Sequence, residues 1–219
     1  MQENKISKRI KFLIDLCPNF KTYADIGCDH GYTALNLIQT KKCKFVYCVD
    51  IHLLSLEKAK ILFQNNNIQD KAKFYCCDGF CDLTKQERDE IDCAVIAGMG
   101  GIETIKILDI YKPQNLVLQP MHNQKELREY LIKNNYTIKK DIVFSEKNKF
   151  YTFLLCEKSD NITLYSDFEL EFGKSQNNID YINYIKFQKE KYIKIFRKTN
   201  NEHILNVLQN LENVLNYKR

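Results

Sequence analysis

The sequence predicts an α/β fold in which helices cover both faces of a doubly wound, mostly parallel sheet. Short runs rich in Val, Ile, Phe, Tyr and Cys alternate with helical periods from residue 23 to residue 134. That alternation is typical of βαβ units. The stretch Asp25-Ile26-Gly27-Cys28-Asp29-His30-Gly31-Tyr32 joins the first such strand to the first such helix. Open α/β sheets bind nucleotides at this kind of turn.

The individual elements follow from the hydrophobic periodicity. An amphipathic helix over 5–17, which Pro18 ends, precedes the alternating region. We expect strands at 23–27, 45–50, 73–77, 92–97 and 115–119, and helices at 30–39, 53–66, 101–109 and 123–134.

Two further strands, 137–146 and 150–157, are separated only by Lys147-Asn148-Lys149. This connection is too short for a crossover helix, so we expect an antiparallel hairpin at one edge of the sheet. Parallel strands that end in such a hairpin are the layout of the Rossmann-like (class I) methyltransferase fold.

The chain changes character near residue 160, which divides it into a domain over 1–160 and a helical extension over 161–219. No strand pattern is evident after Phe172. Apolar residues form one helical stripe from Ile182 to Ile195 and a second from Ile204 to Leu215, with a turn near Asn200. We expect a coiled-coil-like helical hairpin.

Composition restricts the compartment and the partners. The nine cysteines are an odd number and lie mostly in apolar stretches, which favours reduced thiols in the cytoplasm. No apolar run is long enough to span a membrane. The net charge of +5 is concentrated in two basic runs, which are typical either of solvated helix faces or of contacts with nucleic acid. The runs are Lys5, Lys8, Arg9 and Lys11, and Lys186, Lys189, Lys191, Lys194, Arg197 and Lys198.

Three acids stand at the ends of three consecutive predicted strands: Asp25, Asp50 and Asp78, the last followed by Gly79. An acid at the end of the second strand accepts ribose hydroxyls in doubly wound folds, although Asp50 could instead cap a helix. Asp78 could bind an adenine amine or be a plain loop residue. Negative carboxylates disfavour a phosphorylated ligand, so we expect a nucleoside cofactor without a pyrophosphate.

The fourth and fifth strands are followed by Ala97-Gly98-Met99-Gly100-Gly101 and by Gln119-Pro120. Glycines allow a ligand to approach the backbone, and the following helix offers N–H groups at its start. Gln119 carries both a donor and an acceptor that suit a base edge. The alternatives are a tight turn without a ligand and an ordinary polar residue at a strand end.

Metal and hydrolase chemistry are disfavoured. Cys76, Cys77 and Cys81 have no second cluster of ligands, the four histidines are scattered, and no Gly-x-Ser-x-Gly elbow occurs. We expect no metal.

Together these motifs resemble the bacterial tRNA (adenine-22, N1)-methyltransferases, the TrmK family. The resemblance rests on Arg9, the stretch from Asp25 to Tyr32, Asp78-Gly79, Ala97 to Gly101, Leu118-Gln119-Pro120, Leu127-Arg128 and Phe168 to Gly173. It implies S-adenosylmethionine as cofactor, tRNA as partner and 1-methyladenosine as product. The chain departs from the family pattern at Asp50, where Glu is usual, and at Met121, where Asn is usual.

The resemblance also assigns roles to residues. It implies cofactor contacts by Asp25, Gly27, Cys28, Asp50, Ile51, Cys77, Asp78, Gly79, Ala97, Gly98 and Met99. It implies catalytic roles for Asp29, His30, Tyr32 and Gln119, and tRNA contacts by Arg9, Gly100, Pro120, Lys189, Lys194 and Arg197. We expect a monomer. The residues alone also fit a methyltransferase for another RNA position or a small molecule, or a non-catalytic RNA- or nucleoside-binding protein.

Overall fold

A seven-stranded sheet forms the centre of the protein, which we describe from a computed structural model over residues 6–161, 164–174 and 178–216. The strand order is β3-β2-β1-β4-β5-β7-β6. Strands β1 to β5 are parallel, and β7 is antiparallel to both β5 and β6. The bounds are β1 Thr22–Ile26, β2 Phe45–Asp50, β3 Ala72–Cys76, β4 Cys93–Ala97, β5 Asn115–Gln119, β6 Tyr136–Glu146 and β7 Lys149–Lys158. The predicted fold class and the antiparallel hairpin are therefore confirmed.

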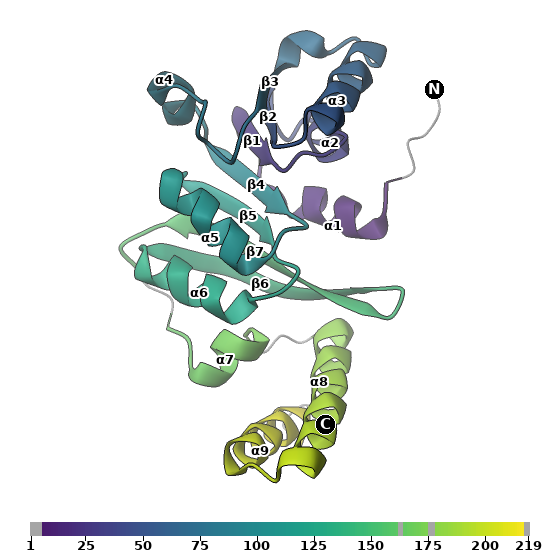
Figure 1. Ribbon diagram of the computed structural model, residues 1–219, viewed down its shortest axis with the longest axis vertical. Helices are drawn as coiled ribbons and strands as arrows, with labels where there is room; N and C mark the ends of the chain where they lie inside the picture. The colour runs from purple at the N-terminus through teal and green to yellow at the C-terminus, as the bar shows by residue number, and fades with distance from the viewer. Residues whose placement is uncertain (1–5, 162–163, 175–177, 217–219) are drawn as a thin grey trace.

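Helices cover both faces of this sheet (Figure 1). Their bounds are α1 Lys8–Leu16, α2 Tyr32–Gln39, α3 Leu53–Asn65, η1 Gln69–Lys71, α4 Lys85–Asp89, α5 Gly101–Ile110, α6 Gln124–Lys133, α7 Asp167–Phe172, α8 Ile179–Thr199 and α9 Glu202–Asn216. Within the described ranges, none of them combines the length and apolarity that a bilayer crossing requires.

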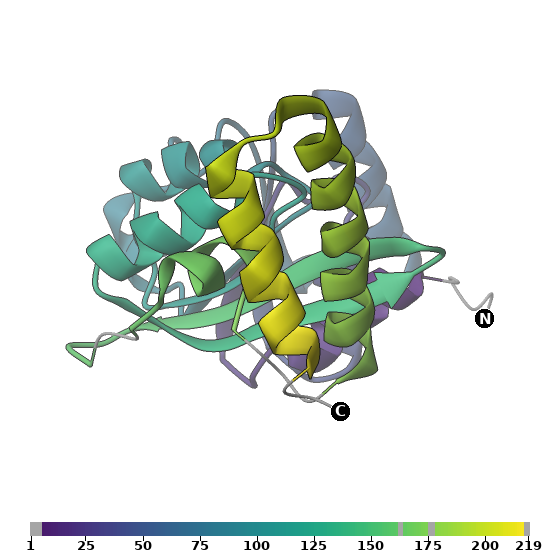
Figure 2. The same ribbon diagram turned by 90° about the horizontal axis from the view of Figure 1, so that it is seen from below.

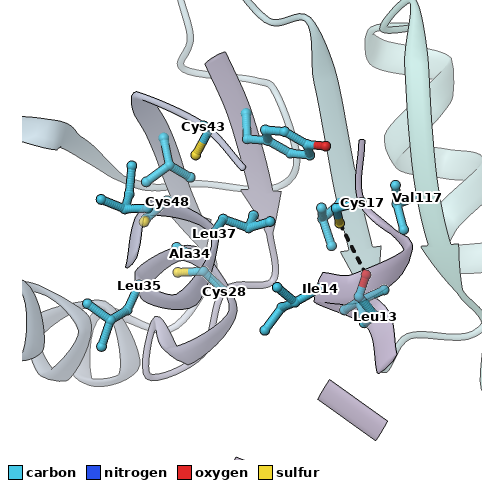
Figure 3. Packing of buried hydrophobic residues seen from close by; sticks show 14 of the residues in the cluster. Leu13, Ile14, Cys17, Cys28, Ala34, Leu35, Leu37, Cys43, Cys48 and Val117 are labelled. Atoms are coloured by element: carbon cyan, nitrogen blue, oxygen red, sulfur yellow. Dashed lines mark hydrogen bonds between the residues drawn. The ribbon is translucent and has the colours of Figure 1, made fainter. Parts of the chain in front are cut away.

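Two hydrophobic cores lie on opposite faces because neighbouring strand residues point in opposite directions. Tyr23 packs with α1, α2 and α3, whereas Ala24 packs with α5 and α6. Five buried cysteines belong to the first core, among them Cys17, whose thiol donates to the Leu13 carbonyl (Figure 3). Burial raises the pKa of Cys17 and of Cys43 to about 12, so both thiols stay protonated and pack as apolar groups.

The structure corrects three predicted boundaries. Helix α1 begins at Lys8 rather than at residue 5, because Ser7 has extended backbone and caps the helix through its side chain. Helix α2 begins at Tyr32 rather than at residue 30, because Asp29 and Gly31 both have positive φ and hold the chain in a turn. In the hairpin the turn is only Lys147-Asn148, with Lys149 already in β7. Both turn residues have positive φ, as a two-residue hairpin turn requires. Lys5, in the predicted first helix and basic run, lies outside the described residues.

The sequence analysis missed two short helices, α4 and α7. Each begins with a capping box: Thr84 pairs with Glu87 and Ser166 with Glu169. In a capping box the side chain of the first residue accepts a hydrogen bond from the backbone N–H three residues later. The side chain of that later residue accepts one from the backbone N–H of the first residue. The Thr-x-x-Glu and Ser-x-x-Glu patterns are present in the sequence, but helices this short contain too few apolar positions to show a helical period.

A buried ion pair connects the sheet domain to the C-terminal helices. Arg128 of α6 donates through Nε and Nη2 to the two carboxylate oxygens of Asp141 on β6, at 2.8 and 2.9 Å. Both side chains are almost fully buried. The third guanidinium nitrogen donates to the Leu170 carbonyl in α7, and the Tyr165 hydroxyl donates to Asp141. Four segments therefore meet at one guanidinium.

Helices α8 and α9 form the predicted helical hairpin, which lies beside β6 (Figures 1 and 2). Tyr181, Ile185 and Leu211 pack with Phe172 of α7 and Val143 of β6 in a third core. The Ser145 backbone N–H and hydroxyl both donate to Asp180, the second residue of α8. Helices α8 and α9 thus pack against strand β6 at the edge of the sheet and not only against each other.

Candidate functional site

A cavity of about 720 Å³ opens where the parallel strands end. Its size falls within the roughly 300–1,000 Å³ typical of small-molecule and cofactor sites. Most residues that the sequence analysis singled out line it: Arg9, Asp25, Gly27, Cys28, Asp29, His30, Tyr32, Asp50, Ile51, Cys77, Asp78, Gly79, Ala97, Gly98, Met99, Gly100 and Gln119. The fold therefore brings together side chains from five strand ends and from helix α1.

The turn after β1 needs glycine at Gly27. Its φ is +73°, and a Cβ there would meet the Met99 methyl at 2.1 Å. The Gly27 and Cys28 backbone N–H groups both donate to the Val49 carbonyl of β2. The turn is thereby fixed to the neighbouring strand, with the flexible end of Met99 above it.

Asp25 lies at the base of this turn and is 3% exposed. Its Oδ2 accepts the Ala34 backbone N–H at 3.1 Å, which connects β1 to the first turn of α2. Burial, helped by the nearby carboxyl groups of Asp50 and Asp29 and opposed by the hydrogen bond from Ala34, raises the pKa of Asp25 to about 7. A positive charge in the cavity would favour the ionised carboxylate.

Asp50 organises the loop rather than capping a helix. Its Oδ2 accepts the Asp29 backbone N–H and its Oδ1 accepts the His52 backbone N–H, both at 2.8 Å. The N-cap of α3 is His52, which rules out the alternative of Asp50 as that cap. Each carboxylate oxygen keeps a further lone pair that can accept a hydroxyl from a ligand.

Asp78 lies on the loop after β3, between Cys77 and Gly79, and is exposed where it borders the cavity. Gly79 has a φ of +57°, and a Cβ there would press on Ile107 of α5 at 3.1 Å. The glycine therefore allows this loop to lie close to α5.

The glycine loop after β4 serves two different purposes. Gly98 has a φ of +80°, and a Cβ there would meet nothing within 4 Å, so the backbone faces open space. At Gly101, by contrast, a Cβ would lie 2.2 Å from the Asn123 carbonyl oxygen. The Gly101 N–H donates to the His122 carbonyl, so this N–H at the start of α5 is not available to a ligand, contrary to our expectation.

Gln119 is 1% exposed and is already hydrogen-bonded at both ends of its amide. Arg9 Nη1 donates to Oε1 at 3.2 Å, while Nε2 donates to the Pro120 carbonyl at 3.2 Å. Both ends of the amide are therefore already engaged within the protein, although Oε1 keeps a second lone pair. Arg9 also lies over the Tyr151 ring at 5.3 Å, so its side chain faces the cavity rather than the solvent face of α1.

Asp29, His30 and Tyr32 form the rim of the cavity. Asp29 Oδ1 accepts the Ser55 hydroxyl at 3.2 Å and lies 3.6 Å from His30 Nε2. Lys58 Nζ lies 3.3 Å from the same ring nitrogen, and the ring of Tyr32 lies edge-on to that of His30. A carboxylate, an imidazole and a phenol thus stand together at the entrance.

Some expected site residues lie elsewhere, and others were missed. Pro120 does not line the cavity. Lys189, Lys194 and Arg197 lie on α8, and Lys189 pairs with Glu212 of α9 at 2.8 Å. The sequence analysis overlooked cavity residues on α1, α2, α3 and α5, namely Ile10, Thr33, Ser55, Glu103 and Lys106. Of these residues, only Glu103 could have been predicted to lie near the site, because it is in the first turn of the helix that follows the glycine loop.

Among the residues that the structure describes, no group of three or more His, Cys, Asp or Glu side chains could hold a metal ion.

The sequence is similar to those of known proteins over most of its length. A methyltransferase-domain family model matches residues 6–154. The tRNA (adenine(22)-N(1))-methyltransferase of Bacillus subtilis is 29% identical over 178 residues, which are 79% of this chain and 74% of that protein. A putative tRNA methyltransferase of Mycoplasma pneumoniae is 34% identical over 147 residues, 66% of this chain and 67% of that protein.

A solved structure of M. capricolum TrmK in complex with S-adenosyl-homocysteine superposes with a TM-score of 0.84. It is 25% identical in sequence, and the match covers 97% of each chain, the C-terminal helices included.

Proposed function

Since the chain belongs to the TrmK family of methyltransferase-domain proteins, we propose that it methylates N1 of adenine 22 in tRNA with S-adenosylmethionine. The observation that carries this proposal is the cavity that is lined both by the acids at three strand ends and by the open Gly98 backbone. The acids suit a nucleoside cofactor on one side, and the glycine loop leaves room for a base on the other.

The residues present fit this cofactor. Asp50 keeps lone pairs for two ribose hydroxyls, and Asp78 borders the cavity within the same ring of strand ends. Asp25 can balance the positive charge of an amino acid moiety once it ionises. The residues that we assign to the cofactor are Asp25, Gly27, Cys28, Asp50, Ile51, Cys77, Asp78, Gly79, Ala97, Gly98 and Met99, all of which line the cavity.

The bound cofactor supplies a methyl group on a sulfonium. Adenine N1 forms the new bond with its in-plane lone pair as the carbon–sulfur bond breaks, and the positive charge passes to the base. Such a displacement needs the reacting atoms in line and about 3–3.5 Å apart, so orientation is the main contribution of the protein. Because N1 is normally base-paired, the site must receive the nucleotide unpaired or flipped out.

The rim residues receive the catalytic roles. Tyr32 is exposed at the entrance and offers a ring on which the base can stack. Asp29 and His30, which lie together beside it, stabilise the positive charge that develops on the base. Gln119 and Gly100, which both line the cavity, hold the edge of the base.

Outside the cavity, basic side chains of the protein bind the phosphate backbone of the tRNA. Lys194 and Arg197 are exposed on α8, whereas Lys189 is partly engaged with Glu212. Exposed cations bind phosphates without reading sequence. We assign residues 1–160 to the methyltransferase domain and 161–219 to this tRNA-binding extension, and we place the protein in the cytoplasm as a monomer.

One comparison separates this function from the alternatives. The full-length protein is incubated with methyl-labelled cofactor and, in parallel, unmodified tRNA transcripts, total protein and a small-molecule extract. Label in tRNA alone is the expected result. Label in protein or small molecules would overturn the proposal, and cofactor binding without transfer to any fraction would favour a non-catalytic binding protein.

A further inference from the structure

We propose that Arg9 is a positioning residue that makes the site selective for a base with an exocyclic amino group, by fixing the amide of Gln119. The inference rests on the proposed function, and it concerns the choice of base rather than methyl transfer itself. The relationship that carries it is the Arg9 Nη1 to Gln119 Oε1 hydrogen bond at 3.2 Å.

The orientation of the Gln119 amide is determined by two partners that each allow only one reading. Arginine can only donate, so the atom that faces Arg9 must be the oxygen. A backbone carbonyl can only accept, so the atom that faces the Pro120 carbonyl must be the nitrogen. A flipped amide would set two donors against each other and two acceptors against each other.

The oxygen is the end of the Gln119 amide that contacts a cavity-lining side chain, that of Arg9. Arg9 and Gln119 line the cavity, whereas Pro120 and Met121, the two partners of Nε2, do not. Arg9 uses one lone pair of Oε1, and a carbonyl oxygen has two. The second lone pair can therefore accept a hydrogen bond from an amino group such as N6 of adenine.

Arg9 itself is held in place by the hairpin. Glu146, at the end of β6, accepts the backbone N–H groups of Lys8 and Arg9 at 3.0 and 3.3 Å. The guanidinium also lies over Tyr151 of β7 at 5.3 Å. Helix α1 is thus attached to the β6–β7 hairpin, and these contacts fix the position of the Arg9 side chain at the cavity.

The test uses two tRNAs that differ at position 22 only by the amino group. One carries adenosine and the other carries purine riboside, which keeps N1 and its lone pair but lacks N6. Because the amino group also makes N1 more nucleophilic, each kcat/KM is divided by the rate of uncatalysed N1 methylation of the same nucleoside. On this scale we expect the wild-type protein to prefer adenosine by ~10-fold, since a buried acceptor left without its donor is costly. Arg9→Met should bring this ratio close to 1, mainly by slowing methylation of adenosine.

Two variants provide the controls. Arg9→Lys retains a donor for Oε1 and should keep most of the preference, whereas Lys11→Met removes a charge from the same helix and should leave the preference unchanged. Gln119→Met removes the oxygen itself and should abolish the preference, which provides a second route if Arg9→Met folds poorly. Binding of S-adenosyl-homocysteine checks that each variant keeps its cofactor site.

Equal values on this scale for both tRNAs with the wild-type protein, or an unchanged preference in Arg9→Met, would overturn the inference while leaving the proposed function intact. No methylation of adenosine 22 by the wild-type protein would instead overturn the proposed function, and the inference with it.

Discussion

The carboxylate of Asp50 accepts the backbone N–H of Asp29 at 2.8 Å, and this contact holds the first loop of the site in shape. Asp29 has a φ of +48°, a conformation that few residues other than glycine adopt. The charge-assisted hydrogen bond compensates for that strain. One side chain at the end of β2 therefore positions the turn that joins β1 to α2.

Asp50→Ala should weaken cofactor binding because it removes both the hydroxyl acceptor and the support of this loop. Hydrogen bonds to charged groups contribute about 1.5–3 kcal/mol, so the loss should be roughly 10- to 100-fold in Kd. Calorimetric titration with S-adenosyl-homocysteine measures it. Asp70→Ala, which removes an exposed carboxylate outside the cavity, should bind as the wild type does, and equal Kd values for the two variants would refute the role of Asp50.

Asp25 should make the protein less stable as pH rises. Burial raises the pKa of its carboxyl to about 7 in the folded state, whereas the unfolded chain releases the proton near about 4. Between these values the folded state binds more protons than the unfolded state, so the free energy of unfolding falls as pH rises from about 4 to about 7 and then levels off.

Asp25→Asn removes this titration while its amide oxygen can still accept the Ala34 N–H. The drop in Tm between pH 5 and pH 8 should therefore be smaller in the variant than in the wild type. For a chain of this size, about 1 kcal/mol moves Tm by roughly 2–4 °C, which thermal melts resolve. The same pH dependence in both proteins would assign it to other groups.

The Arg128–Asp141 pair should be essential for packing the C-terminal helices on the domain. Asp141→Ala leaves a buried guanidinium without its carboxylate, which typically costs about 3–5 kcal/mol. Replacing both residues with leucine should cost less, because no buried charge remains. Urea unfolding of Asp141→Ala and of the double variant tests this. A double variant less stable than Asp141→Ala would contradict the account.

Charge reversal on α8 should weaken tRNA binding and spare the cofactor. The triple variant with Lys189, Lys194 and Arg197 changed to Glu loses up to three phosphate contacts. The slope of log Kd against log salt should then decrease by between about 2 and 3 units. We expect Lys194 and Arg197 to contribute most, because Lys189 is paired with Glu212.

The matched control changes three exposed lysines near the opposite ends of the strands, Lys41, Lys44 and Lys71, to Glu. It alters the net charge by the same amount. If both triple variants lose tRNA affinity equally, the effect is one of total charge and α8 is not a specific contact surface.

The sheet could be predicted from the sequence because four of the parallel strands, β1, β2, β4 and β5, are buried on both faces and read as largely apolar runs. Strand β3 lies at the edge and is only partly buried. The strand-end acids and the glycine loop were predictable for the same reason, since strand ends place them at one edge. The orientation of individual side chains could not be predicted. Arg9 belongs to a basic run in the sequence, yet its guanidinium turns toward Gln119, 110 residues away.

The buried pair of Arg128 and Asp141 shows the same limit. A charged residue in an amphipathic helix is normally solvated. Nothing in the local pattern indicates that the helix C-terminal to β7 supplies a carbonyl to this arginine, because that contact depends on how distant segments pack.

The most direct test of the central claim is to locate the methyl group. Two transcripts of the same tRNA, one with adenosine and one with guanosine at position 22, are incubated with the protein and S-adenosylmethionine, and the modified nucleoside is mapped by mass spectrometry. The account predicts one 1-methyladenosine per tRNA, at position 22, and none in the guanosine transcript. A methyl group at any other position, or equal incorporation into both transcripts, would contradict it.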